Sequence, residues 1–179
     1  MLFGVLMIFT SCNSQTKNTQ PTNLQSVTGE IVNELGKSIM VIYQDKKNNY
    51  WFGSWETGVY KYDGKSIRNY TTEHGLPSNR IDEIKEDALG NIYFSSCCPN
   101  ATVTKFDGNN FKVLTPSSSN NWQLNSTDLW FKHSYSQEKV YRYDGTTLHE
   151  LQISKPEGFS NPFEIYTIYK DTKGNIWFG

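Results

Sequence analysis

Five aromatic and polar residues in the first half of the chain could together bind a sugar. A tryptophan offers a flat ring on which a sugar can stack, and nearby histidine, asparagine, arginine and carboxylate groups supply hydrogen-bond donors and acceptors. The structural alternative is that the tryptophan packs on a neighbouring element and the histidine is a solvated loop residue. This alternative is the commoner one for residues of this kind. The candidates are Trp55, Glu56, His74, Asn79 and Arg80, which would share a face with Cys97, Cys98 and Asn100.

Patterns typical of catalytic centres do not occur in the sequence. There is no Gly-x-Ser-x-Gly, His-Glu-x-x-His or phosphate-binding loop, and His74 has no evident acid or metal-ligand cluster beside it. His133 and His149 have no partner pattern, and we expect both to be surface residues on strands. Adjacent cysteines on a strand point to opposite faces, so two unpaired thiols are favoured over a disulfide or a metal site. We expect no enzyme activity, no metal and no cofactor.

The composition indicates an all-β protein without a phosphate-binding surface. The net charge is -1, so we expect no nucleic-acid partner. Aromatic residues make up 15% of the chain, with eleven tyrosines, ten phenylalanines and five tryptophans. Residues of this kind suit pleated, half-buried strands better than helices.

The first twelve residues predict an export signal. Residues 2–9 form a short apolar run, and a polar tract begins at Asn13. An apolar segment this short, ending in small residues, indicates a signal peptide rather than a membrane helix. Residues 9–12, Phe-Thr-Ser-Cys, resemble the lipobox of bacterial lipoproteins, which implies a lipid on Cys12 and a membrane-anchored protein of the cell envelope. The alternative is an ordinary signal peptide with an incidental cysteine.

A unit of about 42 residues recurs from residue 39 onwards. Each copy has an alternating strand, an Asp-x-x-Gly-Asn turn and a second strand, and Asp87 follows Asp45 by 42 residues. Asp171 follows after 84 more, which is two periods, and the intervening copy at residues 127–131 keeps the second strand without the tight turn. A third and a fourth strand joined by Asp-Gly complete each unit. A period of about 42 residues with four short strands per unit predicts β-propeller blades of four antiparallel strands, with three full blades and a partial fourth.

The chemistry of the turns explains why the same residue types recur. An Asp carboxylate can bond backbone N–H groups further along its turn, and Gly or Asn supplies the positive φ. Asn48 replaces Gly in the first copy, a change that a left-handed position tolerates. The structural turn residues are Asp45, Asp63, Gly64, Asp87, Gly90, Asp107, Gly108, Asp144, Gly145, Asp171 and Gly174.

The repeats divide the chain and place the candidate residues. We expect a signal peptide at 1–12, a polar tether at 13–30 and propeller repeats at 31–179, with blades near 39–80, 81–120, 121–160 and 161–179. Both tight turns of a blade lie on one rim. The connections from the second to the third strand and from one blade to the next lie on the opposite rim, and the five candidates fall in these connections.

Three segments resemble the two-component regulator propeller repeat. They are Asp-x-x-Gly-Asn-Ile-Trp-Phe-Gly at 171–179, Gly-Val-Tyr-Lys-Tyr-Asp-Gly at 58–64 and Tyr-Thr-x-x-x-Gly-Leu-Pro-Ser-Asn at 70–79. The resemblance covers residues 39–179. It implies a periplasmic sensor module of the kind carried by hybrid histidine kinases of Bacteroidetes, which respond to polysaccharide fragments. Shorter, lipid-anchored members without a kinase exist, and this chain looks like one of them.

These observations favour a binding or sensing module outside the cytoplasm, lipid-anchored, with a glycan or protein ligand. One alternative is a propeller enzyme similar to streptogramin lyase, whose Gly-Asn-Ile-Trp-Phe strands look alike, and another is a purely architectural envelope protein. Propellers remove edge strands by closing a ring, usually of at least four blades. We therefore also expect this chain to be part of a longer protein that supplies the missing blades.

Overall fold

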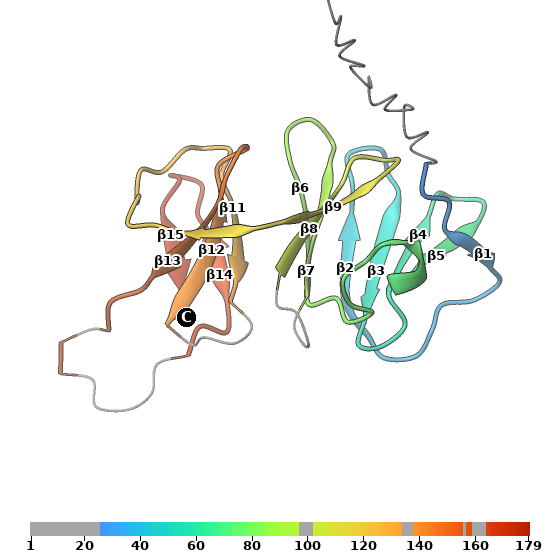
Figure 1. The fold of residues 1–179 in the computed structure, drawn as a ribbon, viewed down its shortest axis with the longest axis horizontal. Helices are drawn as coiled ribbons and strands as arrows, with labels where there is room; N and C mark the ends of the chain where they lie inside the picture. Colours follow the sequence, from blue (N-terminus) through green and yellow to red (C-terminus); the bar gives the residue numbers. More distant parts are fainter. Residues whose placement is uncertain (1–25, 97–101, 134–137, 156, 159–163) are drawn as a thin grey trace, which may run out of the picture.

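The computed structural model describes residues 26–96, 102–133, 138–155, 157–158 and 164–179. These residues form β-strands in four sheets and one short 3-10 helix, η1 (Thr72–His74). The predicted all-β fold is confirmed. Figure 1 shows the first and second sheets side by side, with the strands β11 to β15 of the other two sheets grouped at the far end of the molecule. Within the described ranges, no helix is long and apolar enough to cross a membrane.

The first blade contains the four strands that the repeat predicts. They are β2 (Ile39–Gln44), β3 (Tyr50–Ser54), β4 (Val59–Tyr62) and β5 (Ile67–Tyr70), each antiparallel to the next. A fifth strand, β1 (Glu30–Val32), pairs antiparallel with β5 at the far edge of the sheet. At the opposite edge, β2 contacts the first strand of the second blade, so this is the inner side on which neighbouring blades converge.

The second blade repeats this order with four antiparallel strands. They are β6 (Glu83–Glu86), β7 (Ile92–Ser96), β8 (Thr102–Phe106) and β9 (Phe111–Leu114). The fourth sheet, which is the start of another blade, has two strands, β14 (Ile168–Lys170) and β15 (Ile176–Phe178).

The third blade is built differently. It contains β11 (Leu129–Lys132), β12 (Lys139–Tyr143) and β13 (Leu148–Gln152), which match the second, third and fourth strands of a repeat. In the described part of the chain no strand covers the inner edge of β11. Instead β10 (Pro116–Ser118) pairs parallel with β13 at the outer edge. The degenerate copy has thus lost its inner strand together with its tight turn.

The cores lie between the blades. Trp51, Val59 and Tyr70 of the first blade pack against Ile84, Phe94 and Phe106 of the second. A second cluster joins the second and third blades, and a third joins the third blade to β14 and β15. The second contains Tyr93, Val103, Leu114, Phe131, Tyr141, Tyr143 and Leu148, and the third contains Trp130, Val140, Leu151, Ile168, Ile176 and Phe178. Each core therefore forms between the facing sides of two neighbouring blades.

The Asp-x-x-Gly-Asn turn is closed by one carboxylate that accepts four hydrogen bonds. Asp45 Oδ1 accepts from the backbone N–H of Lys47 and Asn49, at 2.9 and 2.8 Å. Its Oδ2 accepts from Asn49 Nδ2 at 2.8 Å and from the indole Nε1 of Trp51 at 2.9 Å. Asn48 has φ +62°, the left-handed conformation expected of it. The same cage recurs around Asp87, with Tyr93 as the aromatic donor, and around Asp171, with Trp177.

The Asp-Gly hairpins use a smaller version of this arrangement. Oδ1 of Asp63, Asp107 and Asp144 each accepts two backbone N–H groups across the turn. At Asp144, Oδ2 also accepts from His149 Nε2 at 2.6 Å. His149 is 9% exposed, so the expectation that it is a surface residue is wrong. The pairing of β12 with β13 places the His149 ring next to the turn between them, where the Asp144 carboxylate accepts its hydrogen bond.

Several predicted features lie outside the described residues. These are the signal peptide at 1–12 with Cys12, most of the tether at 13–30, and Cys97, Cys98 and Asn100.

Candidate functional site

Two loops of the first blade meet on the rim opposite the tight turns. One loop joins β3 to β4, and the other joins β5 to the second blade. The backbone N–H of Gly58 in the first loop donates to the carbonyl of Asn79 in the second, at 2.8 Å. The N–H of Ile81 in turn donates to the carbonyl of Ser54, at 2.9 Å. Gly58 has φ +85°, and a Cβ there would lie 2.0 Å from the carbonyl oxygen of Tyr70. Only glycine permits this approach. The rim is therefore a single hydrogen-bonded surface made from residues 54–58 and 71–81.

The exposed Trp55 and the partly buried Arg80 form the centre of this surface. The guanidinium carbon of Arg80 lies 3.5 Å from the centroid of the Trp55 ring, which is a close cation–π contact. Asp82 Oδ1 accepts from Arg80 Nε at 2.8 Å and orients the guanidinium. Trp55 is 47% exposed despite this contact. The structure thus presents an aromatic ring and a fixed cation together, and Glu56 is exposed next to the tryptophan in the same loop.

His74 and Asn79 support the loop instead of projecting from it. Nδ1 of His74 accepts from the backbone N–H of Thr71 at 3.1 Å and completes a capping box around η1. Oδ1 of Asn79 accepts from Thr72 N at 2.8 Å. In Figure 1, η1 lies beside the lower end of the first blade. The sequence-predicted residues therefore divide into a presented pair, Trp55 and Arg80, and two that hold the loop on which Arg80 lies.

A polar cluster in the third blade was not evident from the sequence. Glu150 Oε1 accepts from Lys139 Nζ at 2.7 Å, and its Oε2 lies 3.1 Å from His133 Nε2. The rings of His133 and Tyr141 are 4.7 Å apart. The partners are separated by up to 17 residues and meet only through the register of β12 and β13. No local spacing in the sequence could have indicated this cluster.

The cluster perturbs the pKa values of its members in different directions. Burial lowers the pKa of His133 even though Glu150 opposes the shift, so its imidazole is neutral at pH 7. The hydrogen bond from Lys139 holds the pKa of Glu150 below its ordinary value. Burial, with the Glu150 charge, raises the pKa of Tyr141 to about 12. The Glu150 carboxylate contacts both Lys139 and His133. The cluster therefore suits a structural role, in which it holds β12, β13 and the end of β11 together.

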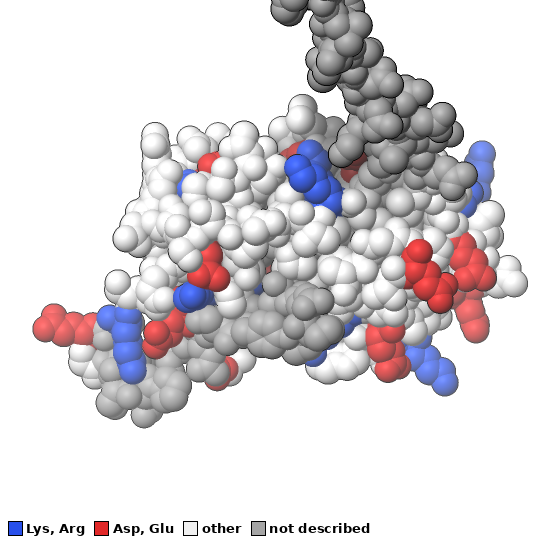
Figure 2. All heavy atoms as spheres, viewed as in Figure 1, with Lys and Arg blue, Asp and Glu red and all other residues white. Residues whose placement is uncertain are grey.

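The described residues provide no metal centre, and the face of the molecule shown in Figure 2 is not strongly charged. Nowhere among them do three His, Cys, Asp or Glu side chains gather as metal ligands. On the face shown in Figure 2, basic and acidic side chains are interspersed between wide uncharged areas.

The matching family model is the two component regulator propeller, which matches residues 33–56 and 158–179. No curated protein matches the chain.

Several solved propellers resemble the structure. Virginiamycin B lyase from Staphylococcus aureus matches with a TM-score of 0.60 and 17% identity over 82% of this chain and 50% of the lyase. The extracellular domain of a hybrid two component system from B. thetaiotaomicron matches with 0.60 and 20%, over 82% of this chain and 22% of that one. PorZ, a surface component of the type-IX secretion system of Porphyromonas gingivalis, matches with 0.54 and 20%, over 79% and 23%.

The chain spans half or less of the length of these solved proteins. At such identities the likeness concerns the fold, and it agrees with the blade order described above. The fold is therefore that of β-propeller blades, and residues 33–56 and 158–179 match the two-component regulator propeller repeat.

Proposed function

We propose that the chain is an extracytoplasmic binding and sensing module that recognises a glycan at the rim surface of Trp55 and Arg80. The stacked Trp55–Arg80 pair is the observation that carries this proposal. The location is supported by two similar solved structures, one an extracellular domain and the other a bacterial surface component.

The chemistry of the pair suits a sugar. The exposed part of the Trp55 ring can stack on the C–H face of a pyranose, and the guanidinium can donate to its hydroxyl groups. Asp82 already fixes the guanidinium, so little side-chain entropy is lost when the ligand binds. Glu56 stands next to Trp55 in the loop as a further acceptor.

We assign a binding rather than a catalytic role. Nδ1 of His74 is engaged in the cap of η1, and Oδ1 of Asn79, on the same loop, accepts a hydrogen bond from the backbone. The likeness to a lyase is a likeness of fold, which does not carry catalysis with it.

A glycan array on the full chain tests the ligand. We expect binding to one or a few oligosaccharides and loss of this signal in Trp55→Ala. The matched control is Trp122→Ala, which removes a tryptophan of similar exposure, 41%, from a segment near the third blade. An array without hits, combined with capture of a protein partner that needs Trp55, would replace the glycan by a protein ligand. Binding that survives Trp55→Ala would remove the rim surface from the proposal.

We also propose that a lipid on Cys12 anchors the chain to the membrane, and this is tested separately. Cells expressing the full chain are grown with an azide-bearing fatty acid, which should label the wild-type protein and not Cys12→Ser. Export without labelling would favour an ordinary signal peptide in place of a lipid anchor.

A further inference from the structure

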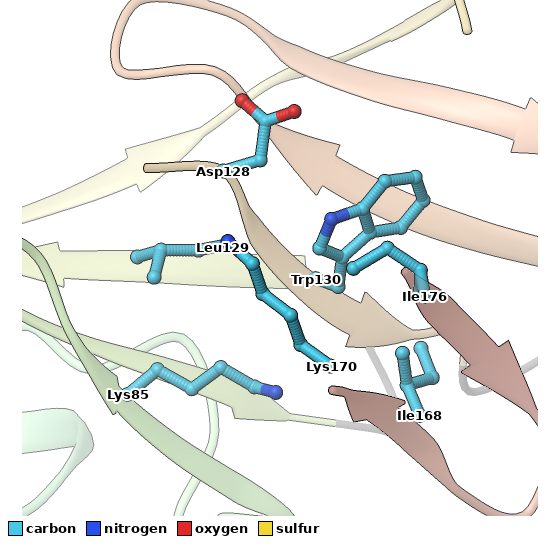
Figure 3. A pocket seen from close by; sticks show the side chains of 7 residues that line it. All are labelled: Lys85, Asp128, Leu129, Trp130, Ile168, Lys170 and Ile176. Atoms are coloured by element: carbon cyan, nitrogen blue, oxygen red, sulfur yellow. The ribbon is translucent and has the colours of Figure 1, made fainter. Parts of the chain in front are cut away.

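The inner edge of β11 lines a cavity of about 190 Å³ at the place where the other blades have an additional strand. The cavity lies between β6 of the second blade, β11 of the third, and β14 and β15 of the fourth sheet. Its apolar walls are Leu129, Trp130, Ile168 and Ile176. Figure 3 shows Trp130, Ile168 and Ile176 together on one side of this space and Leu129 on the other.

Two lysines extend into the cavity from opposite sides. Lys85 reaches in from β6 and points towards β14, and Lys170 reaches up from β14 towards β11 (Figure 3). Lys170 Nζ donates to the carbonyl of Ser126, and no carboxylate of the described residues forms an ion pair with it.

The charge of Lys85 is only weakly compensated. Glu83 Oε1 lies 3.8 Å from Lys85 Nζ, at the outer limit of an ion pair, and Glu83 Oε2 accepts from the backbone N–H of Lys132. The ring of Phe131 lies 5.6 Å from the ammonium. Burial lowers the pKa of Lys85, and Glu83 counteracts this only in part. An anion in the cavity would relieve this cost.

Among the described residues of the cavity wall, the one carboxylate is Asp128, and it is already paired with an arginine. Asp128 Oδ2 accepts from Arg142 Nη1 at 3.1 Å and from Asn125 N at 2.9 Å, and the Asp128 and Arg142 side chains are both fully buried. The lysines therefore leave the cavity with a net positive charge.

We infer that this cavity binds a small organic carboxylate, with the carboxylate group paired to Lys85 in the field of Lys170 and a compact apolar body against Ile168, Ile176 and Trp130. At about 30 Å³ for each displaced water, the space accommodates a ligand of roughly six to nine non-hydrogen atoms. This site lies at the inner side of the blades, away from the rim surface, and it is independent of the proposed function.

Titration calorimetry with benzoate and its uncharged analogue benzamide tests the inference on the full chain. The two probes have the same shape, so their difference reports on charge. We expect saturable benzoate binding and at least about tenfold weaker binding of benzamide, because the charge-assisted bond is lost. Equal affinity for the two probes, or no saturable binding of benzoate, would overturn the inference.

Variants locate the binding. We expect Lys85→Met to weaken benzoate at least about tenfold, while Lys112→Met, at an exposed position on β9, leaves it unchanged. If Lys85→Met loses the far-UV circular dichroism of the folded chain, Lys170→Met on a different strand takes its place. Benzoate affinity that is the same in wild type, Lys85→Met and Lys170→Met would place the ligand elsewhere and refute the site.

Discussion

Asp45 is the residue on which the first tight turn depends most. Its two carboxylate oxygens accept four hydrogen bonds, including one from the buried Trp51, and the residue itself is 6% exposed. These bonds hold its pKa below the ordinary value, although burial alone would raise it. The carboxylate therefore ties the turn to the core between the blades.

Asp45→Asn should destabilise the chain by about 2 kcal/mol or more, because an amide NH₂ must then face one pair of donors. The measurement is the free energy of unfolding in urea. Asp63→Asn is the matched control: a single oxygen of Asp63 accepts both backbone bonds, so an asparagine keeps them and the loss should be much smaller. Equal losses of stability in the two variants would show that the four hydrogen bonds to Asp45 stabilise the chain no more than the two backbone bonds to Asp63.

Asp144 should contribute stability that depends on pH. Burial would raise its pKa, but the bonds from Thr147 N, His149 and Thr146 hold the pKa well below its usual range. An acid with a depressed pKa in the folded state stabilises fully above its unfolded pKa of about 4 and loses that contribution as the pH falls through the folded value.

The difference in unfolding free energy between wild type and Asp144→Asn should therefore be constant at about 1 to 2 kcal/mol above pH 5 and shrink towards pH 2. Urea unfolding at pH 7, 5 and 3 measures it, with Glu34→Gln at an exposed position as the control. A difference that grows on acidification would contradict the assignment.

At the scale of residues, local turn chemistry was predictable and long-range pairing was not. The turn acids bond within a few positions of themselves, so Asp45 and Asp144 could be recognised from spacing alone. The contact of Trp55 with Arg80 depends on how two loops meet. The bond of His133 to Glu150 depends on strand register, and neither contact leaves a sequence pattern.

At the scale of elements, the third blade replaces an inner strand with side-chain contacts. Its inner edge, β11, is approached by Glu83, which accepts from Lys132 N at 2.8 Å. Arg142 and Asp128 pair behind it, fully buried, and Arg142 Nη1 also donates to the carbonyl of Gln123. This network anchors the segment before β11, which has no turn motif of its own.

Arg142→Met should destabilise the chain by about 3 kcal/mol or more, because it leaves Asp128 charged and buried without its partner. The double variant Asp128→Leu/Arg142→Met should regain most of this loss. A double-mutant cycle in urea measures the coupling, and a double variant no more stable than Arg142→Met would show that the pair is not coupled.

The repeat predicted the strand order of the first two blades, because their turns and alternation are intact. It could not predict that β10 joins the outer edge of β13, or that β1 joins β5. These additions follow from which edges are left open once the blades have formed. They are properties of the assembled sheets and not of any local segment.

At the scale of the whole molecule, the first blade and the fourth sheet carry exposed apolar side chains on the sides that face no neighbouring blade. Trp51 and Trp177 make the same bond to their turn aspartates, yet Trp51 is 1% exposed and Trp177 is 60% exposed. The second blade covers Trp51, and no described residue covers Trp177 in this way. On the first blade, Met40 and Ile42 of β2 are 49% and 62% exposed.

Such faces should drive self-association of the isolated chain. We expect sedimentation velocity to show concentration-dependent growth of the sedimentation coefficient, reduced in Ile42→Glu and in Trp177→Glu. Leu89→Glu is the control, because Leu89 is 87% exposed but lies in a turn on the rim. If Leu89→Glu reduces association as much as Ile42→Glu and Trp177→Glu do, the association does not depend on the exposed sides of the first blade and the fourth sheet.

The segments that a bound oligosaccharide covers show whether the rim surface of Trp55 and Arg80 is the binding site. Hydrogen–deuterium exchange of the full chain, with and without the strongest oligosaccharide from the array, reports which segments the ligand protects. We expect protection of residues 54–58 and 71–81, absent in Trp55→Ala. Protection confined to other segments, or the lack of any oligosaccharide that binds, would contradict it.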